Sequence, residues 1–149
     1  MNELETGFLK EKLNESIKSG DDSFLENYKN QINQKPISDL LYNFIQQVSE
    51  GNRKKEREIR KATQLGQSTY NHILSGQKNP SRNSLLCILI ALELDIDTCN
   101  RTLKKAGFNE LYVKNKRDII IYKGVLQHES VAVINDLLYK EGLELLTKE

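Results

Sequence analysis

Residues 61–91 read KATQLGQSTYNHILSGQKNPSRNSLLCILIA, and they contain two helical patterns separated by a short turn. The turn comprises residues 64–66, and a polar helix is predicted to follow from Gln67 to Leu74. A loop with the sequence SGQKNPSR comes next and leads into an apolar helix. The polar helix carries hydrogen-bonding side chains where an ordinary surface helix carries Glu and Lys: Gln67, Ser68, Asn71 and His72.

Helical spacing places these four side chains on one face of the helix. Gln67 lies one turn from Asn71, and Tyr70 and Ile73 are predicted to point inward on the opposite face. Amide and hydroxyl groups are what the edges of bases in a DNA major groove require. We therefore expect a helix-turn-helix whose second helix contacts bases through the four polar residues. The alternative is that they are ordinary exposed polar side chains.

Positive charge is concentrated around this motif. Residues 51–83 carry 8 basic and 2 acidic side chains, whereas the whole chain has a net charge of only +1. A local excess of this kind is typical of a surface that faces phosphate, although a solvated basic face would look the same. The preceding helix is predicted over Lys54–Thr63 with Asn52 as its cap, and its N-terminus is a candidate phosphate site. Its basic residues are Arg53, Lys54, Lys55 and Arg57.

The fold class predicted from the sequence is all-α. Apolar residues recur with helical period throughout the chain. The chain has only 2 Pro and 8 Gly, fewer turn-forming residues than the many turns of a β fold require. Residues 1–36 are predicted to form an N-terminal helical hairpin, since Pro36 disfavours helix in the residue before it. Residues 37–108 are predicted to form a five-helix domain that begins with a helix capped by Ser38. Residues 109–149 are predicted to form a C-terminal helical hairpin.

Four further helices have recognisable boundaries. Ser81 is expected to cap the apolar helix, and another helix is expected over Asp97–Ala106. The two helices of the C-terminal hairpin are expected over Lys116–Leu126 and from a cap at Ser130 to Gly142.

Several classes of function are disfavoured. Cys87 and Cys99 lack metal-ligand spacing, and His72 and His128 are too isolated to complete a zinc site, so we expect neither a metal nor a cofactor. The two thiols are expected to be small core or partly buried residues. No carboxylate is tied to a nucleophile, a metal or a phosphate-binding loop, so an enzyme is not expected. The N-terminus has no signal-peptide pattern and no apolar run could span a bilayer, so a cytoplasmic protein without a membrane partner is expected.

Residues 38–107 resemble the phage-repressor-like helix-turn-helix proteins, also called the xenobiotic-response-element family. The tail motifs NKRDIII at 115–121 and INDLL at 134–138 are similar to a subgroup of bacterial regulators with two further helices. The segments that carry the main resemblance are Ile73-Leu74-Ser75-Gly76, Asn79-Pro80-Ser81-Arg82, Leu85-Leu86 and Ala91-Leu92-Glu93-Leu94.

The resemblance implies a five-helix repressor-type domain that binds double-stranded DNA. It implies base contacts at the positions already named and phosphate contacts in the following loop, at Gln77, Lys78, Asn79 and Arg82. Pairing of Arg82 with a nearby carboxylate is the alternative at that position. Two positions depart from the family pattern, in which a small residue is usual at Arg60 and a glycine at Gln64.

The C-terminal hairpin carries more apolar side chains than one flank of a small domain needs. Packing onto the preceding helices would explain some of them. For the rest we expect a homodimer interface within residues 116–146, or a binding surface for a regulatory protein partner. The candidate interface residues are Ile120, Ile121, Val133 and Leu137.

The interpretation favoured by the sequence is a sequence-specific DNA-binding transcriptional regulator that reads the major groove with helix 67–74. The alternative is a protein-interaction module with a helix-turn-helix fold, such as an antitoxin-like or kinase-associated adaptor, whose basic surface faces an acidic protein.

Overall fold

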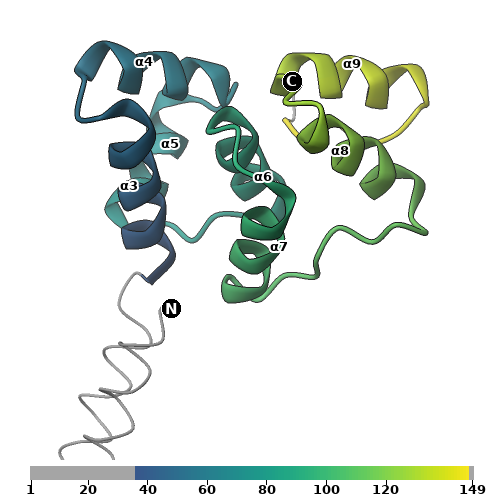
Figure 1. Ribbon diagram of the computed structural model, residues 1–149, viewed down its shortest axis with the longest axis horizontal. Coiled ribbons are helices and arrows are strands. Elements are labelled where there is room, and N and C mark those ends of the chain that lie inside the picture. Colours follow the sequence, from purple (N-terminus) through teal and green to yellow (C-terminus); the bar gives the residue numbers. More distant parts are fainter. Residues whose placement is uncertain (1–35, 148–149) are drawn as a thin grey trace, which may run out of the picture. The chain divides into compact units, whose positions relative to one another are not determined.

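The computed structural model describes residues 36–147, and that range contains seven helices and no strand (Figure 1). The helices are α3 Pro36–Ser49, α4 Arg53–Ala62, α5 Gln67–Ser75, α6 Arg82–Ala91, α7 Ile96–Lys105, α8 Lys116–Leu126 and α9 Val131–Lys140. The all-helical prediction is confirmed for this part of the chain. The predicted N-terminal hairpin lies, up to residue 35, outside the described residues. From Ile37 onward the chain forms one compact unit.

Side-chain caps set the start of most helices. In each case the cap side chain accepts a hydrogen bond from the backbone N–H three residues later, which satisfies a donor that the helix itself leaves free. The capping residues are Asn52, Ser81, Asp95, Asn115 and Ser130. The caps predicted at Asn52, Ser81 and Ser130 are therefore confirmed.

The predicted start of the first helix in the unit was wrong. α3 begins at Pro36, and Ser38 is a buried residue within its first turn rather than its cap. Proline suits this position because its fixed φ angle is already helical and the N–H that it lacks has no partner in a first turn.

The core is built around α6, in which the whole run from Leu85 to Ile90 is buried. A helix that is apolar on every side must be covered on every side. α6 packs against α4, α7 and α9, while α8 packs against α7 and α9, so the C-terminal pair covers the helices before it (Figure 1). Ile121 is fully buried and serves the core, which removes it from the candidate interface residues, whereas Val133 and Leu137 are exposed.

Both cysteines are completely buried free thiols, as predicted. Burial raises the pKa of Cys87 and of Cys99 to about 12, because a thiolate would lose its hydration there. Within residues 36–147, no cluster of His, Cys, Asp and Glu side chains could hold a metal ion. None of the helices described is long and apolar enough to cross a membrane.

Candidate nucleic-acid interface

A hydrogen-bonded turn of residues 63–66 joins α4 to α5. Thr63 is fully buried, and its hydroxyl donates to the carbonyl of Arg60 at 2.6 Å and accepts from the N–H of Leu65 at 3.2 Å. Gln64 has a φ angle of 61°, in the left-handed region where a side chain costs roughly 1–2 kcal/mol. This is the position at which the repressor-like pattern has glycine. The backbone thus adopts a glycine-like conformation although the residue is glutamine.

The turn presents α5 with its polar face outward. Tyr70 is 5% exposed and Ile73 is 1% exposed, so these two residues anchor the helix to the core. Burial raises the pKa of Tyr70, and the nearby carboxylate of Glu56 on α4 raises it further. The four residues predicted to contact bases are all exposed: Gln67, Ser68, Asn71 and His72.

α5 begins without a side-chain cap. Its N-cap residue is Gly66, which has no side chain to accept a hydrogen bond from the first turn. The N–H groups at the start of this helix therefore have no intrahelical or side-chain cap partner, and they favour an anionic or hydrogen-bonding ligand.

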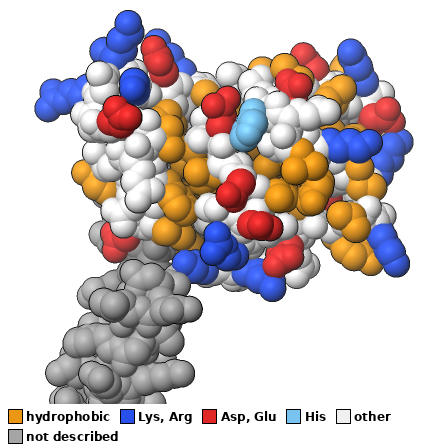
Figure 2. All heavy atoms as spheres, viewed as in Figure 1, with side chains coloured by type: hydrophobic (Ala, Val, Ile, Leu, Met, Phe, Trp, Pro, Cys, Tyr) orange, Lys and Arg blue, Asp and Glu red, His pale blue; other side chains and the backbone are white. Residues whose placement is uncertain are grey.

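The N-terminus of α4 is capped, but the positive charges around it destabilise the helix. Asn52 accepts from the N–H of Lys55 at 3.1 Å. The four basic side chains that follow the cap are exposed, and Figure 2 shows Lys and Arg side chains gathered over α4 at the upper left. Cations near a helix N-terminus oppose the helix dipole and cost typically 0.3–1 kcal/mol each. Such an arrangement is expected where an anionic partner compensates the repulsion.

The loop after α5 is held by its backbone. Gly76 ends the helix with a φ angle of 80°, and the N–H of Lys78 donates to the carbonyl of His72 at 3.1 Å. The loop residues predicted to contact phosphate are exposed: Gln77, Lys78 and Asn79.

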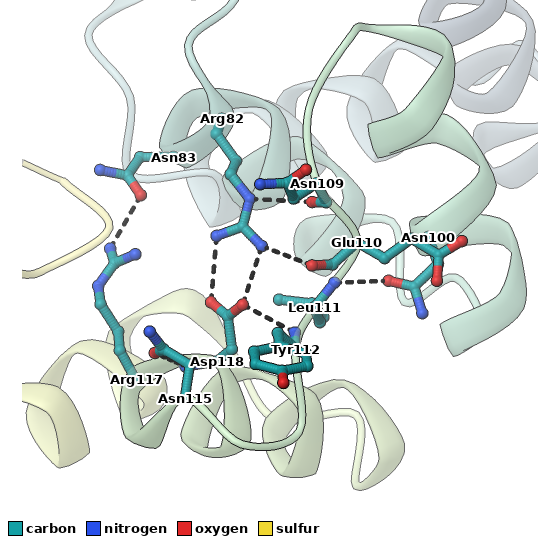
Figure 3. A network of polar contacts seen from close by, with 10 residues as sticks. All are labelled: Arg82, Asn83, Asn100, Asn109, Glu110, Leu111, Tyr112, Asn115, Arg117 and Asp118. Atoms are coloured by element: carbon teal, nitrogen blue, oxygen red, sulfur yellow. Dashed lines mark hydrogen bonds and ion pairs between the residues drawn. The ribbon is translucent and has the colours of Figure 1, made fainter.

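Arg82 differs from the other predicted phosphate contacts because its guanidinium is committed to internal partners (Figure 3). It makes two hydrogen bonds of 3.1 Å to the carboxylate of Asp118. It also donates to the carbonyls of Asn109 at 3.2 Å and of Glu110 at 3.1 Å. The alternative interpretation of this residue, pairing with a carboxylate, is the one that the geometry supports. Arg82 joins α6 to α8 and is removed from the candidate phosphate contacts.

The carboxylate of Asp118 is the centre of this network. Its side chain is only 9% exposed, and besides Arg82 it accepts from the backbone N–H of Tyr112 at 2.8 Å. Beside it, Arg117 donates to the side-chain oxygen of Asn83 at 2.8 Å (Figure 3). The sequence allowed a carboxylate partner for Arg82 but did not identify it, because no local pattern marks a pair of side chains that lie 36 positions apart.

Comparison of the chain with models of known protein families, with curated proteins and with solved structures gives no match.

Proposed function

We propose that this protein is a sequence-specific DNA-binding regulator that inserts α5 into the major groove. One observation carries the proposal: the exposed face of α5 consists of amide, hydroxyl and imidazole groups, while its other face is fixed in the core by Tyr70 and Ile73. A rigid helix that presents donors and acceptors is what direct readout of base edges requires.

Phosphate contacts would come from two places on either side of α5 in the sequence. The basic N-terminus of α4 supplies exposed cations, and residues 77–79 supply a loop that is fixed by its backbone hydrogen bonds. Contacts of this kind position a protein on a duplex, and base contacts then select the sequence. In this proposal α3–α7 form a repressor-like five-helix domain, and two copies of the chain read two half-sites.

The experiment that tests the proposal is selection of bound duplexes from a random pool, followed by substitution of Gln67 or Asn71 with alanine. Either substitution should cost about 1–3 kcal/mol on the selected site and relax the preference at one or two base pairs. Binding to random duplex should hardly change, because the phosphate contacts remain. Gln127→Ala, an exposed amide beyond the C-terminus of α8, is the matched control and should change neither affinity. Equal losses on selected and random duplexes would contradict base reading.

If no duplex is enriched in the selection, the protein-interaction alternative is favoured instead. In that case the basic surface of α4 would face an acidic protein.

A second prediction concerns Lys54 in the first turn of α4. Lys54→Gln should stabilise the free protein by roughly 0.3–1 kcal/mol, because it removes a cation from a helix N-terminus. The same change should weaken DNA binding and reduce the slope of log affinity against log salt by about 1. Urea denaturation measures the first effect and a salt titration measures the second.

Lys105→Gln is the matched control, because Lys105 is an exposed lysine in the last turn of α7, where a cation is favourable. It should destabilise the protein slightly and leave the salt slope unchanged. An unchanged slope for Lys54→Gln would mean that α4 does not face phosphate.

A further inference from the structure

α5 differs from the other described helices in its charge. Among the seven helices within residues 36–147, it alone contains no Asp, Glu, Lys or Arg. In the major groove, Arg and Lys are the side chains that pair with guanine, and Asp and Glu are those that accept from the amino group of cytosine. α5 carries neither kind, so it has no side chain suited to select a G·C pair.

The two amide side chains of α5 match the edge of adenine. A side-chain amide has N–H donors and a carbonyl acceptor next to each other. In the major groove adenine presents the complementary groups, the acceptor N7 and the amino donor N6. Guanine presents only acceptors there, and cytosine and thymine each present a single polar group, so adenine alone pairs with both halves of the amide. Gln67 and Asn71 carry such amides on the exposed face of α5.

Elsewhere in the protein, polar side chains hold the fold together. The helix pairs α6–α7 and α8–α9 correspond to each other at a separation of 35 positions in the chain. In both pairs an asparagine of the second helix accepts from a backbone N–H of the segment that follows, Asn100 from Leu111 and Asn135 from Leu146. In both pairs an arginine in the first turn of the first helix donates to two successive carbonyls of that segment: Arg82 to Asn109 and Glu110, and Arg117 to Glu144 and Leu145.

The amides of α5 are not used in this way. Among the described residues, the side chains of Gln67 and Asn71 have no hydrogen-bond partner. The helix that carries them is anchored instead by Tyr70, which is 5% exposed, and Ile73, which is 1% exposed. Both amides can therefore pair with a base edge without breaking a bond inside the protein, and the fold does not depend on them.

We propose that α5 reads two adenines through their N6 and N7 atoms, one with Gln67 and the other with Asn71. The two residues are one turn apart, a rise of about 6 Å along the helix, and base pairs are about 3.4 Å apart, so the two A·T pairs lie about two base-pair steps from each other. The proposal rests on the proposed function and names the class of DNA sequence that the site takes.

Reading of this kind makes binding sensitive to a chemical modification of DNA. One N6 hydrogen of adenine is used in pairing with thymine, and the other lies in the major groove. A methyl group on N6 takes the place of that second hydrogen. The carbonyl of Gln67 or Asn71 then loses its donor and meets a methyl group instead. The protein is thus expected to bind an unmethylated operator and to bind one methylated at adenine N6 much more weakly.

The first test uses the duplex selected from a random pool and synthetic derivatives of it. Selection should enrich A·T pairs at two positions, and Gln67→Ala should relax the preference at one of them and Asn71→Ala at the other. Replacing either adenine by N6-methyladenine, or by 7-deazaadenine, which lacks the acceptor N7, should weaken binding roughly tenfold. N6-methyladenine at an A·T pair outside the selected half-site is the matched control and should leave the affinity unchanged.

The second test combines the variants with the modified duplexes. Gln67→Ala should be indifferent to N6-methylation of the adenine that Gln67 reads and should remain sensitive at the other adenine, while Asn71→Ala should show the reverse. Gln127→Ala, the exposed amide on the C-terminal side of α8, should keep full sensitivity at both adenines.

The outcomes separate this proposal from the proposed function. Enrichment of another base pair at either position, or full affinity for the modified duplexes, would overturn adenine reading and leave sequence-specific DNA binding intact. Equal sensitivity of all three variants at both adenines would overturn the assignment to Gln67 and Asn71. A selection that enriches no duplex would overturn both proposals.

Discussion

Replacing Arg82 by alanine is expected to destabilise the protein by about 3 kcal/mol, the lower end of the range for breaking a buried ion pair. The change leaves the carboxylate of Asp118 in a site that is only 9% exposed, without the cation that binds it through two hydrogen bonds. It also frees the carbonyls of Asn109 and Glu110. The side chain of Arg82 is itself 24% exposed, so water can reach part of the gap and moderates the loss.

Urea denaturation measures this loss, with Arg101→Ala as the control because Arg101 is an exposed arginine on α7. The control should change stability by less than about 0.5 kcal/mol. Removing both partners, Arg82 and Asp118, should cost less than the sum of the single changes, since no charge is then left buried. The salt slope of DNA binding, measured where the variant is still folded, should not fall. A fall by about 1 with little loss of stability would return Arg82 to the phosphate contacts.

Local signals explain why much of the fold could be predicted. The start of α4 after Asn52 and the full extent of α8 follow from cap residues and apolar period, both of which act within a few residues. The same locality explains the mistake at Ser38, where a good cap residue competed with Pro36 and the proline determined the start of the helix. The exposure of Gln67 and Asn71 was likewise predictable, because the buried side of α5 fixes the other side.

The sequence left the role of Arg82 open between a phosphate contact and a pair with a carboxylate. Its place in the chain matches a phosphate contact, and only the approach of Asp118 from α8 gives it another function. The correspondence between the pairs α6–α7 and α8–α9, in which equivalent residues lie 35 positions apart, is also difficult to see in the sequence. Its repeated contacts use backbone carbonyls and N–H groups, which every residue supplies, so the two copies need to share little more than one arginine, one asparagine and one glycine.

The second large effect is expected where Gly124 of α8 lies against Ile134 of α9. A Cβ atom built on Gly124 would lie 2.5 Å from Cδ1 and 2.6 Å from Cγ1 of Ile134, which is completely buried. Ile134→Ala should cost about 2–5 kcal/mol, because it removes buried apolar atoms and leaves a cavity. Gly124→Ala in the intact chain should cost about 1–3 kcal/mol through overpacking, less the roughly 1 kcal/mol that alanine gains over glycine within a helix.

The two changes should not add, and the sign of the second should reverse. With Ile134 reduced to alanine, the nearest remaining atom is the Cβ at 3.9 Å, an ordinary contact distance. Gly124→Ala then fills part of the cavity and keeps its gain in helix propensity, so it should stabilise the Ile134→Ala variant. The pair α6–α7 shows the opposite combination of sizes. The residues 35 positions before Gly124 and Ile134 are Leu89 on α6 and Cys99 on α7, so there the first helix carries the large residue and the second helix the small one. Urea denaturation of the four proteins in the cycle measures the coupling. Additive losses would mean that α8 and α9 move apart in the Gly124→Ala variant, so that the added Cβ does not contact the side chain of Ile134.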